Sequence, residues 1–263
     1  MISAQNLGVG KVLSDVTFSL PAEGCLGVVG LNGAGKSTLL ALLAGVIRRD
    51  HGSLTVPPGA AYLPEACPLD PGVSVRSWLR LARGLPGFDS GLAKELEEAL
   101  PLPEKTAAGR LSQGQRVRLG LRMTLCRRAP AWILDDPFLG LDPVATRVAE
   151  SVIASRCSDG PVVVAAQDTG IVERLCTHLL LLRDGRPFWF AALQDWRDRF
   201  RSVRVPGAQR AAVESLGSPL LACKTRGSTL ELLLDDPGGR VEEGLDARPL
   251  PLSLSDLLVE IAR

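Results

Sequence analysis

The segment Gly30–Ser37, GLNGAGKS, constrains the fold of this chain more than any other. It fits the pattern G-x-x-x-x-G-K-[ST]. It lies between CLGVVG, an apolar run typical of a strand buried on both faces, and a stretch of helical periodicity that begins at Lys36. Glycines let such a loop turn consecutive backbone N–H groups onto a phosphate, and the following helix N-terminus adds a partial positive charge. The segment therefore predicts a phosphate-binding loop in an α/β fold.

The residues of this loop have separate expected roles toward a nucleoside triphosphate. Lys36 is expected to reach the β- and γ-phosphates, and Ser37 to give its hydroxyl to Mg²⁺. The residues expected to contact ATP are Gly30, Leu31, Asn32, Gly33, Ala34, Gly35, Lys36, Ser37 and Thr38.

Two adjacent carboxylates, Asp135 and Asp136, follow the apolar run AWIL. An acidic residue at the end of a buried strand is what a phosphate-loop fold uses to hold magnesium, so Asp135 is a predicted metal ligand. Asp136 is expected beside the γ-phosphate, where a carboxylate can orient or deprotonate the attacking water.

Strand and helix patterns alternate along most of the chain. The apolar segments AWIL, PVVVAA and HLLLL, with helices between them, predict a mostly parallel sheet. Shorter strands are expected in VLSDVTFSL, GSLTV and AAYLP, and a hairpin turn at residues 183–186. The helix from Lys36 is expected to bury Leu39, Leu40, Leu43 and Val46 and to be closed by Arg48, Arg49 and Gly52. A helix beginning at Asp142–Pro143 is expected to place Val144, Val148 and Val152 on one face.

The pattern changes near residue 200, which predicts two domains. Residues 1–199 are expected to form a nucleotide-binding domain, with a helical subdomain at about 73–125. Residues 200–263 are expected to form a small βαββα-like appendage. Ser112 to Gln115 fits the capping-box pattern that opens a helix.

Composition excludes several classes of protein. A net charge of +1 gives no field that favours nucleic acid or an anionic membrane surface. The six cysteines form no CxxC pair and have no histidine at metal-ligand spacing, which indicates reduced thiols in a cytosolic protein. Because no apolar stretch approaches the roughly 20 residues of a membrane span, any membrane role requires a partner chain.

Taken together, GLNGAGKST, LSQGQR at 111–116 and ILDDPFLGLD at 133–142 resemble the ATP-binding subunits of ABC transporters. The resemblance covers residues 1 to about 190. It implies an ABC-type P-loop NTPase core with a mostly parallel sheet, antiparallel β elements and a helical subdomain, which hydrolyses ATP with Mg²⁺. It also implies a head-to-tail pair with a second such subunit, identical or related. ATP would then lie between the phosphate loop of one subunit and Ser112, Gln113, Gly114, Gln115 and Asp142 of the other.

The same resemblance implies separate transmembrane permease chains and a cytoplasmic location at the inner face of the membrane. The turn from Glu65 to Gly72 is similar to the segment that contacts such chains. The appendage and its final helix are similar to exporter subunits, which implies export.

Four positions depart from the family pattern. Asp136 stands where the family usually has a glutamate, directly after the magnesium ligand. Gln167 stands where the family usually has a histidine, after the next core strand. The Gln167 amide can donate to the γ-phosphate but cannot move a proton. Glu65 stands where glutamine is common and is a further candidate metal ligand. The segment before Leu13 lacks the usual adenine-stacking aromatic residue, so Val9 is the candidate contact for the base.

These departures leave three interpretations open. The chain is the energy-coupling subunit of a transporter with slow turnover, a soluble assembly ATPase of the same superfamily, as in iron–sulfur cluster biogenesis, or an ATP-binding regulatory subunit with little hydrolysis. Intact Lys36, Ser37 and Asp135 favour residual turnover.

Overall fold

The structure is a computed structural model that describes residues 1–65, 67–239, 241 and 244–261. The chain divides into two compact units. Unit 1 comprises residues 1–167 and 174–190, and unit 2 comprises residues 168–173 and 191–263. The predicted domain boundary at residue 200 stays a prediction.

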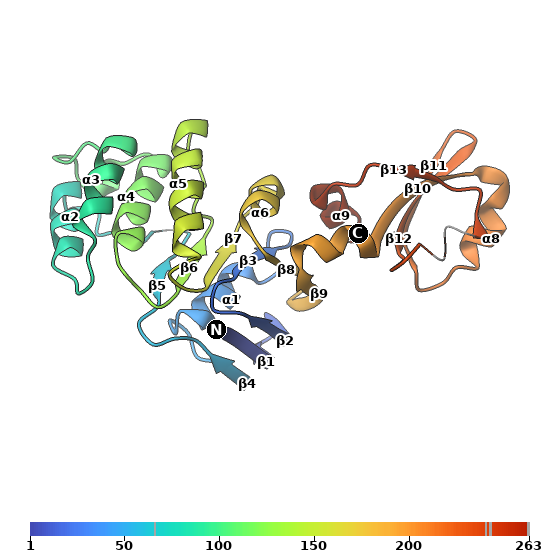
Figure 1. Cartoon of the computed structure of the whole chain (residues 1–263), viewed down its shortest axis with the longest axis horizontal. Coiled ribbons are helices and arrows are strands. Elements are labelled where there is room, and N and C mark those ends of the chain that lie inside the picture. Colours follow the sequence, from blue (N-terminus) through green and yellow to red (C-terminus); the bar gives the residue numbers. More distant parts are fainter. Residues whose placement is uncertain (66, 240, 242–243, 262–263) are drawn as a thin grey trace. The chain divides into compact units, whose positions relative to one another are not determined.

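Two sheets form the framework of unit 1 (Figure 1). The larger has six strands in the order β5-β6-β7-β3-β8-β9. These strands are β5 (Ala61–Leu63), β6 (Trp132–Asp135), β7 (Val162–Ala165), β3 (Cys25–Val29), β8 (His178–Arg183) and β9 (Arg186–Ala192). The first five pair in parallel, as their continuous apolar sequences predict. The smaller sheet is antiparallel, in the order β2-β1-β4, with β2 (Leu13–Leu20), β1 (Ile2–Val9) and β4 (His51–Thr55).

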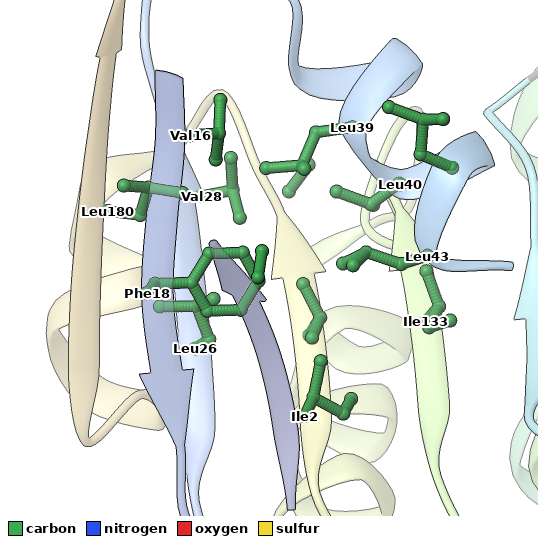
Figure 2. Packing of buried hydrophobic residues seen from close by; sticks show 14 of the residues in the cluster. Ile2, Val16, Phe18, Leu26, Val28, Leu39, Leu40, Leu43, Ile133 and Leu180 are labelled. Atoms are coloured by element: carbon green, nitrogen blue, oxygen red, sulfur yellow. The ribbon is translucent and has the colours of Figure 1, made fainter. Parts of the chain in front are cut away.

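Helix α1 (Lys36–Leu43) follows β3 and packs into the main core cluster. Figure 2 shows Leu39, Leu40 and Leu43 converging with Phe18 of the antiparallel sheet and Ile133 of the parallel sheet. This burial fixes the helix whose N-terminus adjoins the glycine-rich loop.

The remaining helices of unit 1 connect its strands. They are α2 (Val75–Arg83), α3 (Ser90–Ala99), the 3-10 helix η1 (Ala108–Arg110), α4 (Gln113–Leu125) and α5 (Pro143–Arg156), while α6 (Thr169–Leu175) crosses the boundary between the units. The expected amphipathic faces of α2 and α3 are present, with Val75, Leu79 and Leu96 buried. None of the helices among the described residues is long and apolar enough to cross a membrane.

Unit 2 contains a four-stranded antiparallel sheet in the order β11-β12-β10-β13. Its elements are η2 (Leu193–Asp195), α7 (Trp196–Arg199), β10 (Phe200–Pro206), η3 (Gly207–Gln209), α8 (Arg210–Glu214), β11 (Leu220–Arg226), β12 (Thr229–Asp235), β13 (Arg248–Leu250) and α9 (Leu254–Ile261). Val203, Val213 and Leu232 belong to its own core cluster. The βαββα prediction omitted β13, whose three residues are too few to show a period.

Three local features differ from the sequence predictions. Helix α1 ends at Leu43, not near Arg48, because Gly45 adopts φ 71°, and Val46 is 64% exposed. In α5, Val148 and Val152 pack against a core cluster as predicted, but Val144 is 70% exposed and Ala145, Ala149 and Ile153 are the buried apolar residues. Strand β1 was not predicted, because register shifts around Asn6 interrupt its alternation.

Candidate functional site

The carboxyl ends of four neighbouring parallel strands bring the predicted residues together. Glu65 follows β5, Asp135 and Asp136 end β6, Gln167 follows β7, and the loop from Gly30 follows β3. Because these strands are adjacent and parallel, residues far apart in sequence meet at one sheet edge. The sequence predicts the residue types, and the strand order supplies their proximity.

The conformation of the glycine-rich loop requires glycine at two positions. Gly35 caps α1 with φ 99°, and a Cβ there would lie 2.6 Å from Leu13 Cδ2. A Cβ on Gly30 would lie 2.5 Å from the Leu182 carbonyl oxygen. No side chain caps the N-terminus of α1, so its first amides remain suited to bind an anion.

Lys36 lies within this loop and is only 8% exposed. Its Nζ donates to the carbonyl oxygens of Gly30, at 2.9 Å, and Leu31, at 3.1 Å. The ammonium is therefore held against the loop, where its charge complements a phosphate.

The hairpin turn at Asp184–Gly185 braces the loop, a role that the sequence analysis did not assign. Gly185 N donates to the Ala34 carbonyl at 3.2 Å, and Ser14 N donates to the Gly185 carbonyl at 2.9 Å. Gly185 has φ 77°, and a Cβ there would lie 2.0 Å from the Val12 carbonyl oxygen. The Asp184–Gly185 dipeptide predicts the turn, but the contact of this turn with the glycine-rich loop depends on the fold.

A pocket of 370 Å³ opens beside the loop. Its lining consists of Val12, Asn32, Gly33, Gly35, Lys36, Ser37, Thr38, Glu65, Asp136 and Gln167. Val12, rather than the predicted Val9, supplies an aliphatic wall, because Val9 packs against the main core cluster. Tyr62 also packs against that cluster, and burial together with the Asp135 charge raises its pKa to about 12.

Asp135 is a buried carboxylate with an unsatisfied atom. It is 3% exposed, and its Oδ1 has no hydrogen-bond partner among the described residues. Burial raises its pKa to about 6, the Ser37 hydroxyl lowers it, and the charges of Asp136 and Glu65 raise it further. An orphaned buried oxygen of this kind is suited to a cation ligand.

The donor set around Asp135 fits a hard divalent cation. Glu65, Asp135 and Asp136 each offer a carboxylate oxygen, and these three atoms lie within 4.8 Å of one another. Ser37 adds a hydroxyl beside Asp135. Oxygen donors of this kind suit Mg²⁺. The predicted set of Ser37, Asp135 and Glu65 is thus brought together, and Asp136 joins it.

Asp136 and Gln167 form a hydrogen-bonded pair. Gln167 N donates to Asp136 Oδ1 at 3.2 Å, and Gln167 Nε2 donates to Oδ2 at 3.3 Å. Asp136 has φ 46°, and its own N donates to the Ala165 carbonyl at 2.9 Å. Two hydrogen bonds therefore hold this carboxylate at the pocket wall, and a third holds its main chain.

The LSQGQ segment begins α4 but does not line this pocket. Ser112 is the N-cap, and Ser112 and Gln115 form the predicted capping box. Gly114 packs so closely on Gly140 that a Cβ on Gly114 would lie 2.1 Å from the Gly140 carbonyl oxygen. The structure therefore joins these two glycine-containing segments, Ser112–Gln115 and Gly140–Asp142, into one surface.

Asp142 caps α5, as predicted. Its Oδ1 accepts hydrogen bonds from Val144 N and Ala145 N, both at 2.9 Å. Two main-chain amides in the first turn of the helix are therefore paired. Its other carboxylate oxygen pairs with Arg118 of α4. Hydrogen bonds from Ala145 and Val144 and the Arg118 charge hold its pKa below the ordinary value.

Comparisons with known proteins agree with this geometry. The sequence profile of the ABC transporter family matches residues 13–139. The cytochrome c biogenesis ATP-binding export protein CcmA of Rhodobacter capsulatus is 37% identical over 165 residues, which cover 62% of this chain and 77% of the relative. The Nod factor export ATP-binding protein I of Burkholderia lata is 31% identical over 201 residues, which cover 69% of this chain and 66% of the relative. A solved ATP-binding subunit of an ABC transporter matches with TM-score 0.67 and 25% identity, covering 74% of this chain and 91% of that chain.

Proposed function

Because this chain belongs to the family of ATP-binding subunits of ABC transporters, we propose that it binds and hydrolyses ATP to power a membrane transporter, in the direction of export. The main observation in support of this proposal is that one edge of the sheet brings together Lys36, Asp135, Asp136 and Gln167. The export direction is supported by two relatives that are named as export proteins, CcmA and the Nod factor export protein.

The site residues have distinct roles in this proposal. The amides of the loop and the Lys36 ammonium bind the β- and γ-phosphates. Mg²⁺, when held by Ser37, Asp135 and Glu65, supplies charge neutralisation for the phosphate oxygens. Val12, in place of Val9, contacts the base.

Asp136 orients and accepts a proton from the attacking water. The Gln167 amide holds the Asp136 carboxylate in place, and it offers no group that can carry the proton away. Since Asp136 is one methylene shorter than the usual glutamate and Gln167 cannot move a proton, we propose that turnover is slow. The proton accepted by Asp136 leaves to solvent through the open pocket.

A second nucleotide-binding subunit completes the site. Ser112, Gln113, Gly114, Gln115 and Asp142 lie outside the pocket of their own chain, so they are free to cover the nucleotide of a partner. The helix N-terminus at Ser112, whose first turn contains no acidic residue, suits the γ-phosphate. Permease chains would hold the pair at the cytoplasmic face of the membrane.

Single-turnover hydrolysis of Mg·ATP tests this function. We expect Lys36→Ala to abolish phosphate release and Asp136→Asn to reduce its rate by about 10²-fold. The exposed Lys105 and Asp198 supply matched controls, Lys105→Ala and Asp198→Asn, which should release phosphate at the wild-type rate. Wild-type-like release from Asp136→Asn would contradict the role of that carboxylate, and absence of release from wild type would favour a regulatory subunit.

A further inference from the structure

Three of the six cysteines meet in unit 1, at the edge of the sheet opposite the nucleotide site. Cys25 begins β3, Cys157 caps the C-terminus of α5, and Cys176 precedes β8. The glycine-rich loop lies at the other end of β3, so these thiols have no part in the proposed ATP chemistry. They are a cluster that the function leaves unexplained.

Cys25 is the central thiol of this cluster. Its Sγ lies 3.5 Å from Cys176 Sγ, and its thiol also interacts with that of Cys157. Cys25 is fully buried, Cys176 is 8% exposed, and Cys157 is half-buried. The sulfurs of Cys25 and Cys176 are thus within hydrogen-bond distance of each other, and Cys176 is the more exposed thiol of this pair.

The backbone beside these two thiols is already clamped. Thr177 N donates to the Cys25 carbonyl at 2.8 Å, and Cys25 N donates to Thr177 Oγ1 at 3.0 Å. The Thr177 hydroxyl in turn donates to the Cys25 carbonyl at 3.1 Å. These hydrogen bonds hold the two backbone segments next to each other, and the sulfurs, now 3.5 Å apart, must approach to about 2.05 Å to bond.

We propose that Cys25 and Cys176 are a site of oxidative modification, where they form a disulfide that ties the start of β3 to the start of β8. In a reducing compartment the pair stays a dithiol. Under an oxidative challenge, two S–H bonds break and one S–S bond forms, and an external oxidant takes up two electrons and two protons. A diazene oxidant is reduced to the corresponding hydrazine in this step.

Within the pair, Cys176 is more exposed than Cys25 and reacts first. The Cys176 sulfur attacks the diazene nitrogen and forms a sulfenyl hydrazine adduct. Cys25 then attacks the Cys176 sulfur, the S–S bond forms, and the hydrazine leaves with the protons. In this proposal Cys157, whose thiol donates to the Ile153 carbonyl at 3.4 Å, stays a thiol.

The raised pKa of the Cys25 thiol makes this reaction slow, in contrast to the fast reaction of a peroxide-sensing cysteine. The hydrogen bond with Cys157 lowers the pKa of Cys25, but the hydrogen bond with Cys176 and burial outweigh it, so the pKa lies well above its usual range. The hydrogen bond with Cys25 and burial raise the pKa of Cys157 as well. Fast peroxide sensing needs a thiolate at neutral pH. Attack by Cys25 also proceeds through its thiolate, so the raised pKa makes formation of this disulfide slow.

Non-reducing peptide mapping of the full chain after diamide treatment tests the pairing. The expected result is one linked pair of peptides containing Cys25 and Cys176, with a mass lower by two hydrogen atoms and two of the six thiols lost. Cys157→Ser and Cys223→Ser should retain this link, and Cys25→Ser and Cys176→Ser should lose it. A link from Cys25 to Cys157, a link through the exposed Cys223, or no link in wild type would overturn the proposal.

Thermal unfolding supplies a second readout that does not depend on whether the serine variants fold. A disulfide that closes a long loop stabilises the folded state. We expect oxidised wild type to unfold about 5 °C or more above the reduced protein, and dithiothreitol to reverse the rise. An unchanged midpoint in protein that carries the mapped link would contradict the stabilising role.

Discussion

The Asp136 carboxylate accepts hydrogen bonds from both the main-chain and the side-chain nitrogen of Gln167. This pair depends on the parallel register of β6 and β7, in which Asp135 lies opposite Ala165. Asp136, one residue past the end of β6, and Gln167, two residues past the end of β7, are thereby brought within reach of each other. Gln167 thus positions the proposed catalytic base even though it cannot act as an acid or base itself.

The first prediction concerns this positioning role. Gln167→Ala removes the Nε2 donor but keeps the main-chain donor, so the carboxylate is less constrained. We expect kcat to fall by about tenfold or more while the Kd for ATP changes by less than about twofold. Steady-state hydrolysis and nucleotide titration measure the two quantities, and an unchanged kcat would show that the hydrogen bond has no part in turnover.

The second prediction concerns the pH dependence of stability without magnesium. Burial raises the folded-state pKa of Asp135 to about 6 from an ordinary value of 3.8. Between these values the folded state binds more protons than the unfolded state, so stability falls as pH rises through this window. The difference corresponds to about 3 kcal/mol. Urea unfolding in EDTA from pH 4 to pH 7 should show this contribution in wild type.

Asp135→Asn is the matched variant for that measurement. It keeps the shape but has no charge to bury, so its stability should lack the fall between pH 4 and pH 6. Mg²⁺ should stabilise wild type above pH 6 and have little effect on the variant. Parallel pH profiles of the two proteins would contradict the assignment of the buried charge.

The third prediction concerns the brace under the glycine-rich loop. Gly185→Ala would place a Cβ 2.0 Å from the Val12 carbonyl, at a residue with φ 77°. We expect a loss of about 2 kcal/mol or more in the free energy of unfolding and weaker ATP binding, because the turn must move away from Ala34. Chemical unfolding and nucleotide titration report both effects.

Gly227→Ala is the control for backbone strain. Gly227 has φ 60°, and its Cβ would meet no atom within 4 Å among the described residues. It should show a smaller loss of stability and no change in ATP affinity. Equal effects of the two substitutions would mean that Gly185 does not brace the loop.

The fourth prediction concerns the joint between the LSQGQ segment and the loop at Gly140. Gly114→Ala would drive a Cβ to 2.1 Å from the Gly140 carbonyl. We expect the free energy of unfolding to fall by about 1–3 kcal/mol and ATP-dependent dimerisation to weaken. Sedimentation with Mg·ATP measures the second effect. Gly244→Ala, whose Cβ would meet no atom of the described residues within 4 Å, should behave as wild type, and a wild-type-like Gly114→Ala would contradict the close joint.

Local chemistry explains which features could be predicted from sequence. The glycine-rich loop, the capping box at Ser112 and the cap at Asp142 each depend on residues a few positions apart. By contrast, the contact of Gly185 with Ala34 and that of Gly114 with Gly140 join segments distant in sequence. No periodicity encodes such contacts, because they depend on strand order.

The choice of Val9 over Val12 illustrates the same limit. Val9 ends β1 and Val12 precedes β2, and the sequence spacing of these two aliphatic residues does not distinguish them. The turn at Gly10 directs Val9 to the core and leaves Val12 at the pocket. The end of α1 was misjudged for a related reason, because the positive φ of Gly45 outweighs the apolar character of Val46.

The central claim is that the loop from Gly30 to Thr38 binds a nucleoside triphosphate. Calorimetric titration of Mg·ATP into the folded protein tests this claim most directly. The account predicts saturable binding by wild type and by Lys105→Ala, and binding weakened by at least about 10²-fold in Lys36→Ala, which loses the ammonium held in the loop. Absence of binding by folded wild type, or equal affinities for wild type and Lys36→Ala, would contradict it.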